Sequence, residues 1–355
     1  MLPPITRLSP RLAARTMSTV IPKTMKAIQV EKTGGPEVNV MREVPVPTPK
    51  DDELLIKVEW TGANYIDNYR RSGLYKLDLP FFQGQDVVGT IVQLPKAAHQ
   101  ATELGELKLG QRVWSPVGAS FAEYAAATWW KVAPLPDGVD PRDGVSMCTV
   151  ALTAMALVRY SYAVKKGDYI LVRAAAGGVG LVLCQLGKYL GAHVIATTST
   201  EAKAKLAKEN GAEAVLLTTA SSEDNVKEIL RLSEGRGVHA VFDGVGADTW
   251  EENFKVVRTN ATIVTFGNAS GPVPPFSPLK LSPKCLKVTR PTLFPFIANP
   301  EDFATLAKDM TDIVAAGGIK FAVHKEYPFT EEGVQQTQID ITGRGTTGKL
   351  LIHVA

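Results

Sequence analysis

Cysteine is scarce in this 355-residue sequence, which has three cysteines, none of them close to another. Cys148, Cys184 and Cys285 form no Cys-x-x-Cys pattern, and the five histidines are scattered singly. This scarcity argues against a disulfide framework and against a structural zinc lobe. The sequence also lacks an uninterrupted apolar run of about 18 residues, the length that a membrane-spanning helix requires. We therefore expect no membrane partner.

Acidic residues are missing from the first 24 residues, which carry Arg7, Arg11, Arg15 and Lys23. Subtracting these four from the 39 basic residues leaves 35 against 36 acidic residues, so the rest of the chain is nearly neutral. Such a balance is not the footprint of a nucleic-acid-binding protein. The leader, residues 1–24, has the composition of a mitochondrial transit peptide, and a disordered tail is the alternative. We expect a cytoplasmic or a mitochondrial protein.

The rhythm of apolar residues changes near residue 168. Residues 26–150 alternate as short strands separated by turn residues, and an apolar helical pattern follows at 141–162. Strands are then predicted at 168–174, 193–198, 214–217, 238–243 and 261–267, with helical segments between them. This alternation is typical of a doubly wound parallel sheet, and a last strand is expected at 349–354. The fold class is therefore α/β, with a second, β-rich domain.

The run from Tyr169 to Gly180 predicts a strand, a tight turn and a helix. Backbone N–H groups of small turn residues can approach a pyrophosphate, and the N-terminus of the helix favours the anion. The residues expected to contact a dinucleotide here are Ala176, Gly177, Gly178, Val179 and Gly180. Ala175 replaces the first glycine of the usual fingerprint, and a plain strand–helix corner is the alternative interpretation.

The end of the second predicted strand carries no acidic residue. An NAD-binding protein usually places an Asp or Glu there for the ribose 2′-hydroxyl. Here Ser199 stands at this place, and Lys203 follows on the next helix. Room, hydroxyl donors and a cation suit a 2′-phosphate, so we expect NADPH rather than NADH. The alternative is that Lys203 only belongs to a solvated helix face.

Four segments together resemble the quinone oxidoreductases, the zinc-free branch of the medium-chain dehydrogenase/reductase superfamily that includes the zeta-crystallins. They are residues 64–75, 174–180, 266–271 and 290–293. The resemblance implies a GroES-like catalytic domain (25–152 and 297–355) interrupted by a Rossmann domain (153–296). It also implies a homodimer that uses NADPH to reduce quinones, ortho-quinones above all, or activated alkenes such as α,β-unsaturated ketones.

Zinc is not expected in this site. Zinc-dependent members of the superfamily carry a Gly-His-Glu motif where this sequence has Gly84-Gln85-Asp86. A catalytic zinc needs three nitrogen, sulfur or carboxylate ligands, and no such set is visible. Without a metal to polarise an alcohol, the favoured substrates are acceptors that are already electron-poor.

The resemblance also implies roles for individual residues. It places Asn64, Tyr69 and Tyr75 beside the nicotinamide and the substrate, with Asp67 orienting Asn64 or Tyr69. The alternative for Asp67 is that it caps a local turn. The Tyr75 hydroxyl would stabilise or protonate the developing oxygen anion. Along the cofactor the resemblance implies Thr153 at the carboxamide, Val245, Phe266, Gly267 and Asn268 at strand ends, Thr218 after the third strand and Arg344 near the 2′-phosphate.

Two further sequence features concern the adenine end of the cofactor site and the substrate entrance. Thr218 stands where many relatives have a tyrosine, so a stacking partner for the adenine is lost and only a hydroxyl is kept. Basic residues of the segment 276–290 (Lys280, Lys284, Lys287 and Arg290) are expected near the substrate entrance, unless the segment is a solvated loop.

Two other functions are weighed against quinone reduction. The first is a mitochondrial 2-enoyl thioester reductase, which has the same scaffold and would suit the leader. The second is binding of AU-rich RNA in competition with NADPH, for which the sequence offers no motif and no strongly basic face.

Overall fold

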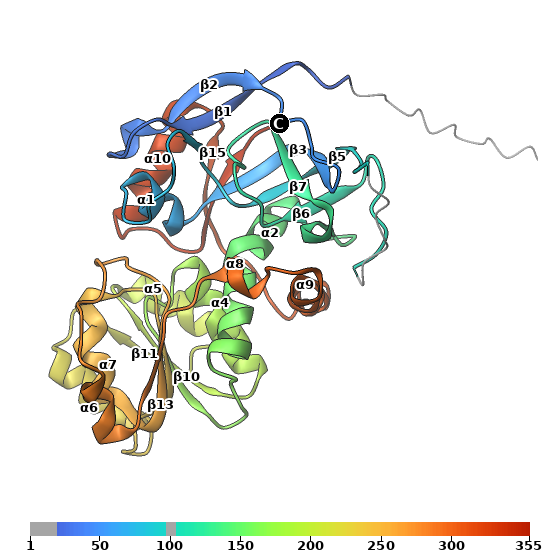
Figure 1. Ribbon diagram of the computed structural model, residues 1–355. Helices are drawn as coiled ribbons and strands as arrows, with labels where there is room; N and C mark the ends of the chain where they lie inside the picture. Colours follow the sequence, from blue (N-terminus) through green and yellow to red (C-terminus); the bar gives the residue numbers. More distant parts are fainter. Residues whose placement is uncertain (1–19, 97–103) are drawn as a thin grey trace, which may run out of the picture.

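The computed structural model describes residues 20–96 and 104–355 of the chain. The predicted leader, residues 1–24, lies outside the described residues apart from residues 20–24. Two lobes are visible in Figure 1, a β-rich lobe and a lobe in which helices cover a parallel sheet. The N-terminal strands, blue in the ribbon, and the C-terminal segment, red, both lie in the β-rich lobe, so the second lobe is built from the middle of the chain.

The β-rich lobe is built on a seven-stranded sheet of order β15-β16-β3-β5-β6-β8, with β7 also paired to β3. A three-stranded sheet of order β2-β1-β4 packs beside it. The strands of these two sheets are β1 (Thr24–Val30), β2 (Val40–Pro45), β3 (Glu53–Ala63), β4 (Phe81–Phe82), β5 (Val87–Gln93), β6 (Arg112–Ser115), β7 (Tyr124–Thr128), β8 (Ala133–Pro134), β15 (Val323–Pro328) and β16 (Lys349–His353).

Strand β3 is the centre of this lobe because both of its faces are covered. Leu54 and Ile56 belong to one hydrophobic cluster, and Leu55, which lies between them, packs with Ala27 of β1 in another. Successive side chains in a strand point to opposite faces, so the three consecutive apolar residues Leu54, Leu55 and Ile56 require burial on both sides. The last strand, β16, pairs antiparallel with β3 and brings the C-terminal segment to the middle of the lobe.

The second lobe contains a six-stranded parallel sheet of order β11-β10-β9-β12-β13-β14. Its strands are β9 (Tyr169–Val172), β10 (His193–Thr198), β11 (Ala214–Leu217), β12 (Val238–Asp243), β13 (Val257–Thr265) and β14 (Lys287–Thr289). All five predicted strands are confirmed, although β13 begins four residues earlier than 261. The sixth strand, β14, was not predicted because three residues are too few to show a period.

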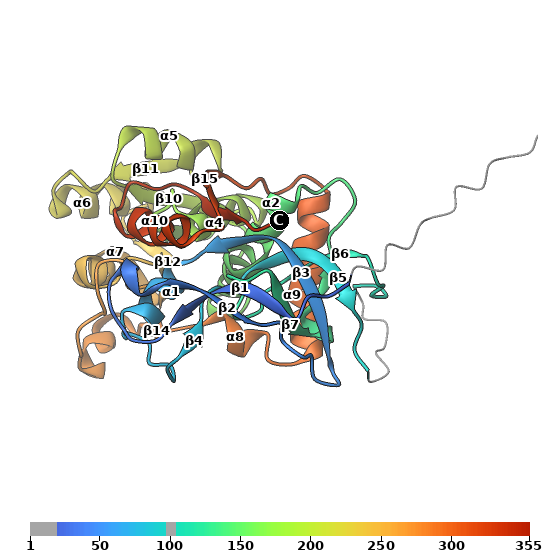
Figure 2. The same cartoon turned by 90° about the horizontal axis from the view of Figure 1, so that it is seen from above.

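Helices cover both faces of this parallel sheet (Figure 2). Ile170 and Val172 of β9 share a cluster with Val182 of the helix after the glycine turn, and Leu171 packs with Trp250 on the opposite face. The helices of the chain outside the inter-lobe segment are α1 (Tyr65–Arg71), α4 (Gly178–Tyr189), α5 (Glu201–Glu209), α6 (Ser222–Leu232), α7 (Trp250–Val256), α8 (Leu293–Phe296), α9 (Pro300–Ala315), α10 (Glu331–Thr342) and the short turns η1 (Pro36–Val38), η2 (Trp129–Lys131), η5 (Ala247–Thr249) and η6 (Pro278–Lys284).

A helical segment, Pro141–Ser161, connects the two lobes. It consists of α2 (Pro141–Ser146), η3 (Met147–Ala151), α3 (Leu152–Ala156) and η4 (Leu157–Ser161). Asp140 caps it by accepting a hydrogen bond from the Arg142 N–H, and proline occupies the first turn. By length and composition this segment could cross a membrane, but 72% of its apolar window is buried inside the protein. Such burial is typical of a core helix.

The two lobes share one hydrophobic core. The largest cluster joins Trp114 of β6, Leu152 of the connecting helix, Phe242 of β12 and Phe303 of α9. The rings of Trp114 and Phe303 lie 6.1 Å apart between centroids. A continuous apolar core fixes the lobes to each other. The predicted domain boundaries, at 152/153 and 296/297, stay predictions, and the connecting helix runs through the first of them without a break.

Candidate active site

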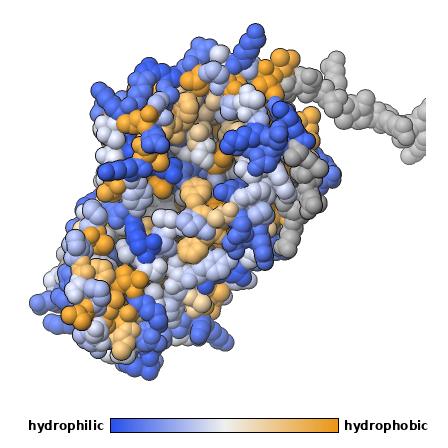
Figure 3. Space-filling view, in the orientation of Figure 1, coloured by the Kyte–Doolittle hydropathy of each residue, from blue (hydrophilic) through white to orange (hydrophobic). Residues whose placement is uncertain are grey.

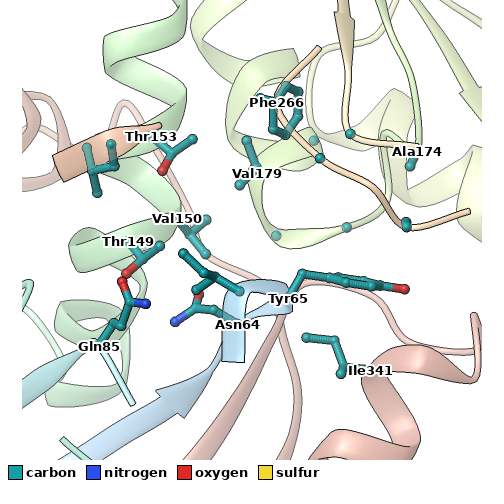
Figure 4. A pocket seen from close by; sticks show the side chains of 18 of the residues that line it. Asn64, Tyr65, Gln85, Thr149, Val150, Thr153, Ala174, Val179, Phe266 and Ile341 are labelled. Carbon is teal, nitrogen blue, oxygen red and sulfur yellow. The ribbon is translucent and has the colours of Figure 1, made fainter. Parts of the chain in front are cut away.

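A cleft lies where the two lobes meet, and the surface is indented there in Figure 3. Its walls come from the start of α1, the connecting helix, the glycine turn before α4, the end of β13, the segment after β14 and the start of β16. Ten of the predicted site residues line it: Asn64, Tyr69, Tyr75, Thr153, Gly177, Gly178, Val179, Gly180, Phe266 and Gly267. Figure 4 shows how Asn64, Thr153, Val179 and Phe266 face this space from four different elements.

The glycine turn is shaped by close backbone approach. A Cβ on Gly180 would lie 2.6 Å from the Ala174 carbonyl oxygen and 2.7 Å from the Ala175 Cα, so only glycine lets α4 pack on the end of β9. Ala174 itself has a φ of 50° at the turn. Gly177 precedes the first turn of α4 and no side chain caps that turn. The N–H groups at the start of α4 are therefore open to an anion in the cleft.

The floor of the cleft is a buried polar network formed by Asn64, Asp86 and Lys349. The Lys349 ammonium lies 2.6 Å from an Asp86 carboxylate oxygen and 2.7 Å from the Asn64 amide oxygen. Asn64 donates its amide N–H to the same carboxylate at 2.7 Å, and the second carboxylate oxygen accepts the Thr149 N–H at 2.9 Å. Asn64 therefore reaches the cleft with both ends of its amide already bonded inside the protein.

Asp67 supports this floor from behind and does not line the cleft. Its carboxylate accepts the backbone N–H of Asn64 at 2.7 Å, at the N-terminus of α1. Burial, with some help from the nearby Asp86 charge, raises the pKa of Asp67 to about 7. Its other oxygen, Oδ1, is buried without a hydrogen-bond partner. Asp67 and Asn64 thus form a capping box at the start of α1, which is the local turn cap that was the alternative interpretation of Asp67, and this cap holds the Asn64 backbone in place.

Two tyrosines stand at the mouth of the cleft and are held by the opposite lobe. The Tyr69 hydroxyl accepts the backbone N–H of Asn268 at 2.7 Å. The Tyr75 hydroxyl accepts an N–H from Arg290 at 2.7 Å and one from the Asn268 amide at 3.3 Å. The two rings lie 5.2 Å apart between centroids, and burial raises the pKa of Tyr69.

Gln85 occupies the place of the missing zinc ligand. It is fully buried and lines the cleft, and in Figure 4 it points toward Thr149. With the amide oxygen assigned to the side that faces Arg70, that oxygen accepts two guanidinium N–H groups at 2.6 and 3.2 Å. Within residues 20–96 and 104–355, no group of three His, Cys, Asp or Glu side chains is placed to hold a metal ion.

The expected 2′-phosphate end lies at the carboxyl ends of β10 and β11. Lys203 donates its ammonium to the backbone carbonyl of Arg344 at 2.6 Å, which joins two residues that are 141 positions apart. Burial lowers the pKa of Lys203. Ser199 follows β10 immediately, and Thr218, after β11, donates its backbone N–H to Thr198 at 2.8 Å. None of these four residues lines the deep cleft.

Three other predicted cofactor residues, Ala176, Val245 and Asn268, do not line the cleft. Ala176 does not line the cleft; its carbonyl accepts the Gly348 N–H at 3.0 Å and ties the glycine turn to β16. Val245 donates its backbone N–H to the buried Asp243 at 2.7 Å, which shapes the loop after β12. Asn268 contacts the two tyrosines instead of lining the cleft.

The expected basic rim at the entrance is wrong for three of its four residues. Lys280 pairs with Glu251, Lys284 donates to the Phe254 and Val257 carbonyls, and Lys287 bonds Asn260. These partners lie on α7 and β13, so the three lysines fasten the segment to the parallel-sheet lobe. Arg290 alone of the four contacts a residue of the cleft.

Sequence reasoning missed Asp86 and Lys349 as parts of the site. Lys349 and Asp86 are 263 positions apart, and their pairing becomes visible only in the folded chain. A weak signal was present, because a lysine at the head of the apolar run Leu350-Leu351-Ile352 breaks the pattern of a buried strand. A buried lysine needs a partner, and the sequence alone did not name one.

Comparisons with known proteins agree with this architecture. Residues 50–137 match the alcohol dehydrogenase GroES-like domain family, and residues 178–312 match the zinc-binding dehydrogenase family. A protein named probable quinone oxidoreductase from Schizosaccharomyces pombe is 36% identical, over 92% of this chain and 96% of its own length. Quinone oxidoreductase 1 of Escherichia coli is 32% identical over 92% and 98%.

Solved structures of quinone oxidoreductases have the same fold as this chain. The Escherichia coli quinone oxidoreductase, solved in complex with NADPH, superposes with a TM-score of 0.86 at 31% identity, over 93% of this chain and all of that one. A mycobacterial protein solved with NADPH reaches the same TM-score at 38% identity over 93% and 100%. The chain has the two-domain fold of a medium-chain dehydrogenase/reductase. Within that superfamily it belongs to the quinone oxidoreductases.

Proposed function

We propose that this protein is a zinc-independent, NADPH-dependent reductase of quinones, with ortho-quinones favoured, and of activated alkenes such as α,β-unsaturated ketones. One observation carries the proposal: the cleft joins an uncapped helix N-terminus to two tyrosine hydroxyls whose hydrogens are not used inside the protein. Relatives that share most of the chain are named quinone oxidoreductases, and two of the similar structures were solved with NADPH.

The residues of this chain fit NADPH. The glycine turn leaves no room for a Cβ at Gly180 and presents the backbone N–H groups of α4, as a pyrophosphate requires. At the far end the Lys203 ammonium bonds the Arg344 backbone carbonyl, and the Arg344 guanidinium lies 3.8 Å from Asp248. We expect these two cations to hold a 2′-phosphate by charge-assisted hydrogen bonds. Thr153 and Phe266 line the middle of the cleft, where a nicotinamide would lie.

When bound, NADPH supplies the hydride. The residues of the cleft then have to stabilise the negative charge that develops on the oxygen of the acceptor. The Tyr75 and Tyr69 hydroxyls are the groups placed for this task, because both accept N–H bonds from the opposite lobe and keep their own hydrogens. A hydroxyl at this position can also deliver the proton that completes the reduction.

The spacing of the two tyrosines supports the preference for ortho-quinones. Their rings lie 5.2 Å apart, so both hydroxyls can face one small acceptor. An ortho-quinone has two adjacent oxygens for two donors, whereas a plain enone has one. Quinones are also electron-poor and can take protons from water, so they depend less on any single donor.

The test is NADPH oxidation by the purified full-length chain with three acceptors: 1,2-naphthoquinone, a plain enone and crotonyl thioester. We expect the quinone to be reduced fastest, and NADPH to be used in preference to NADH. Faster reduction of crotonyl thioester would replace the proposal by the 2-enoyl thioester reductase. The homodimer, the cellular location and AU-rich RNA binding stay predictions.

A further inference from the structure

Arg290 reaches across the cleft between the lobes. It follows β14, the edge strand of the parallel sheet, and one nitrogen of its guanidinium donates to the Thr265 carbonyl at 2.7 Å. Another nitrogen donates to the Tyr75 hydroxyl at 2.7 Å, in a loop of the β-rich lobe that is 215 positions away. The carbonyl anchor at the end of β13 fixes where the guanidinium points.

The contacts of Tyr75 decide where its own hydrogen goes. The phenol oxygen receives an N–H from Arg290 and, at 3.3 Å, an N–H from the Asn268 amide. A guanidinium has no acceptor atom, so Tyr75 cannot donate to Arg290 in return. Because Tyr75 lines the cleft, its hydrogen is left to be donated to a molecule bound there.

We propose that Arg290 is a positioning residue that makes Tyr75 the proton donor of the reaction. The inference rests on the proposed function, because it assigns a role within quinone and enone reduction. Arg290 holds the phenol so that the hydrogen faces the acceptor, and its charge stabilises the phenolate left after the proton has gone.

Bound NADPH would supply one hydride, which carries both electrons of the reduction, and a new C–H or O–H bond would form on the acceptor. The Tyr75 O–H bond breaks, and its proton joins the oxygen of the acceptor. The phenolate beside Arg290 takes a proton back from water, to which the half-buried Tyr75 and the exposed Arg290 are open. NADPH, one proton and a quinone thus give NADP⁺ and a hydroquinone.

The test compares Arg290→Met, Arg290→Lys and the control Lys287→Met. Lys287 lies in the same segment, but it bonds Asn260 and does not reach the cleft. In Arg290→Met we expect the turnover of a plain enone to fall about threefold to tenfold, a modest loss because the contact is partly open to solvent. Arg290→Lys, which keeps the charge, should recover part of this loss, and Lys287→Met should match the unmutated chain.

A double variant separates positioning from general damage. If Arg290 acts through the Tyr75 hydroxyl, Arg290→Met in a Tyr75→Phe background should slow enone turnover no further, while NADPH binding stays within about twofold throughout. Independent, additive losses would overturn the inference, and so would an Arg290→Met variant as active as Lys287→Met. If the unmutated chain reduces neither quinone nor enone, the proposed function itself fails, and this outcome is seen before any variant is made.

Discussion

The floor and the mouth of the cleft are both made of polar side chains, yet they differ in how many hydrogen-bond donors remain free. At the floor, the Lys349 ammonium donates to Ala63, Asn64 and Asp86, so all three of its hydrogens are used inside the protein. At the mouth, the Tyr69 and Tyr75 hydroxyls accept hydrogen bonds from the other lobe and keep their own hydrogens. The polar groups at the floor stabilise the fold, whereas the tyrosine hydroxyls at the mouth can donate a hydrogen bond to a bound molecule.

This difference changes how the predicted catalytic residues are understood. Asn64 has the amide of a typical substrate ligand, but its donor and acceptor atoms are bonded to Asp86 and Lys349. The Tyr75 hydroxyl differs, because only its oxygen is engaged, as an acceptor. A residue type that suits a reaction therefore acts in it only if the fold leaves its reactive atom free.

The largest effect on stability should come from removing the Lys349–Asp86 ion pair at the floor of the cleft. Lys349→Met leaves the Asp86 carboxylate buried without its cation, and such a loss typically costs about 3–5 kcal/mol of stability. We expect a large drop in the thermal unfolding midpoint, measured against the exposed control Lys320→Met. The double variant Asp86→Leu with Lys349→Met should be less destabilised than Lys349→Met alone. Equal destabilisation of single and double variants would mean that the pair is not what holds the floor.

The next effect concerns the protonation of Asp67. Its pKa is about 7 in the folded protein and about 3.9 in an unfolded chain. Between these values only the folded state keeps the proton, so stability should fall as the pH rises from about 4 to about 7 and stay lower above. Asp67→Asn stays neutral and can still accept the Asn64 N–H. It should remove this decline and gain roughly 2–4 kcal/mol above pH 7.

Denaturant unfolding at several pH values measures the Asp67 effect. The matched control is Asp78→Asn, an exposed carboxyl in the loop after α1. Parallel pH profiles for the unmutated chain and Asp67→Asn would show that Asp67 ionises normally and that its burial costs nothing.

At the mouth, Tyr75→Phe removes one donor and keeps the ring. Loss of one donor to a developing oxygen anion typically costs about 10²–10³ in turnover. We expect a loss near the lower end for a plain enone and a few-fold loss at most for an ortho-quinone. NADPH binding should weaken only mildly, and Tyr75→Ala should weaken it more. Unchanged rates on both acceptors would make Tyr75 a packing residue.

A smaller effect is expected at the 2′-phosphate end. Lys203→Ala should raise the dissociation constant of NADPH about tenfold, roughly 1.4 kcal/mol, and leave NADH nearly unchanged. Lys203 is already held beside Arg344 by a 2.6 Å bond, so little ordering is needed on binding. Lys205→Ala is the control, because Lys205 pairs with Glu209 on the same helix. Equal losses for NADPH and NADH would remove Lys203 from the 2′-phosphate.

The smallest effect is expected from metal removal. Gln85 stands where a zinc ligand would be, and its amide is bonded to Arg70. Exhaustive chelation should leave quinone reduction unchanged, and elemental analysis should find much less than one zinc per chain. One tightly held zinc per chain would contradict the zinc-independent mechanism.

Elements with a local signal were predicted well from the sequence. The strands at 193–198 and 238–243 appear with the bounds of β10 and β12, since each is a β-favouring run followed by a helical period. The glycine turn was equally visible, because the residues that shape it are consecutive. The edge strand β14 and the orientation of Lys280 were not, since a strand of three residues and the direction of a side chain depend on neighbours distant in sequence.

The sequence by itself determined the α/β class, the glycine turn of a dinucleotide site and the tyrosines that line the cleft. The tertiary structure alone decided which of these groups keep a free hydrogen. The amide oxygen of Asn64 is bonded to Lys349, 285 positions away, and the hydroxyl oxygen of Tyr75 is bonded to Arg290, 215 positions away. Hydrogen bonds have a reach of about 3 Å, so their partners depend on where the folded chain places its atoms.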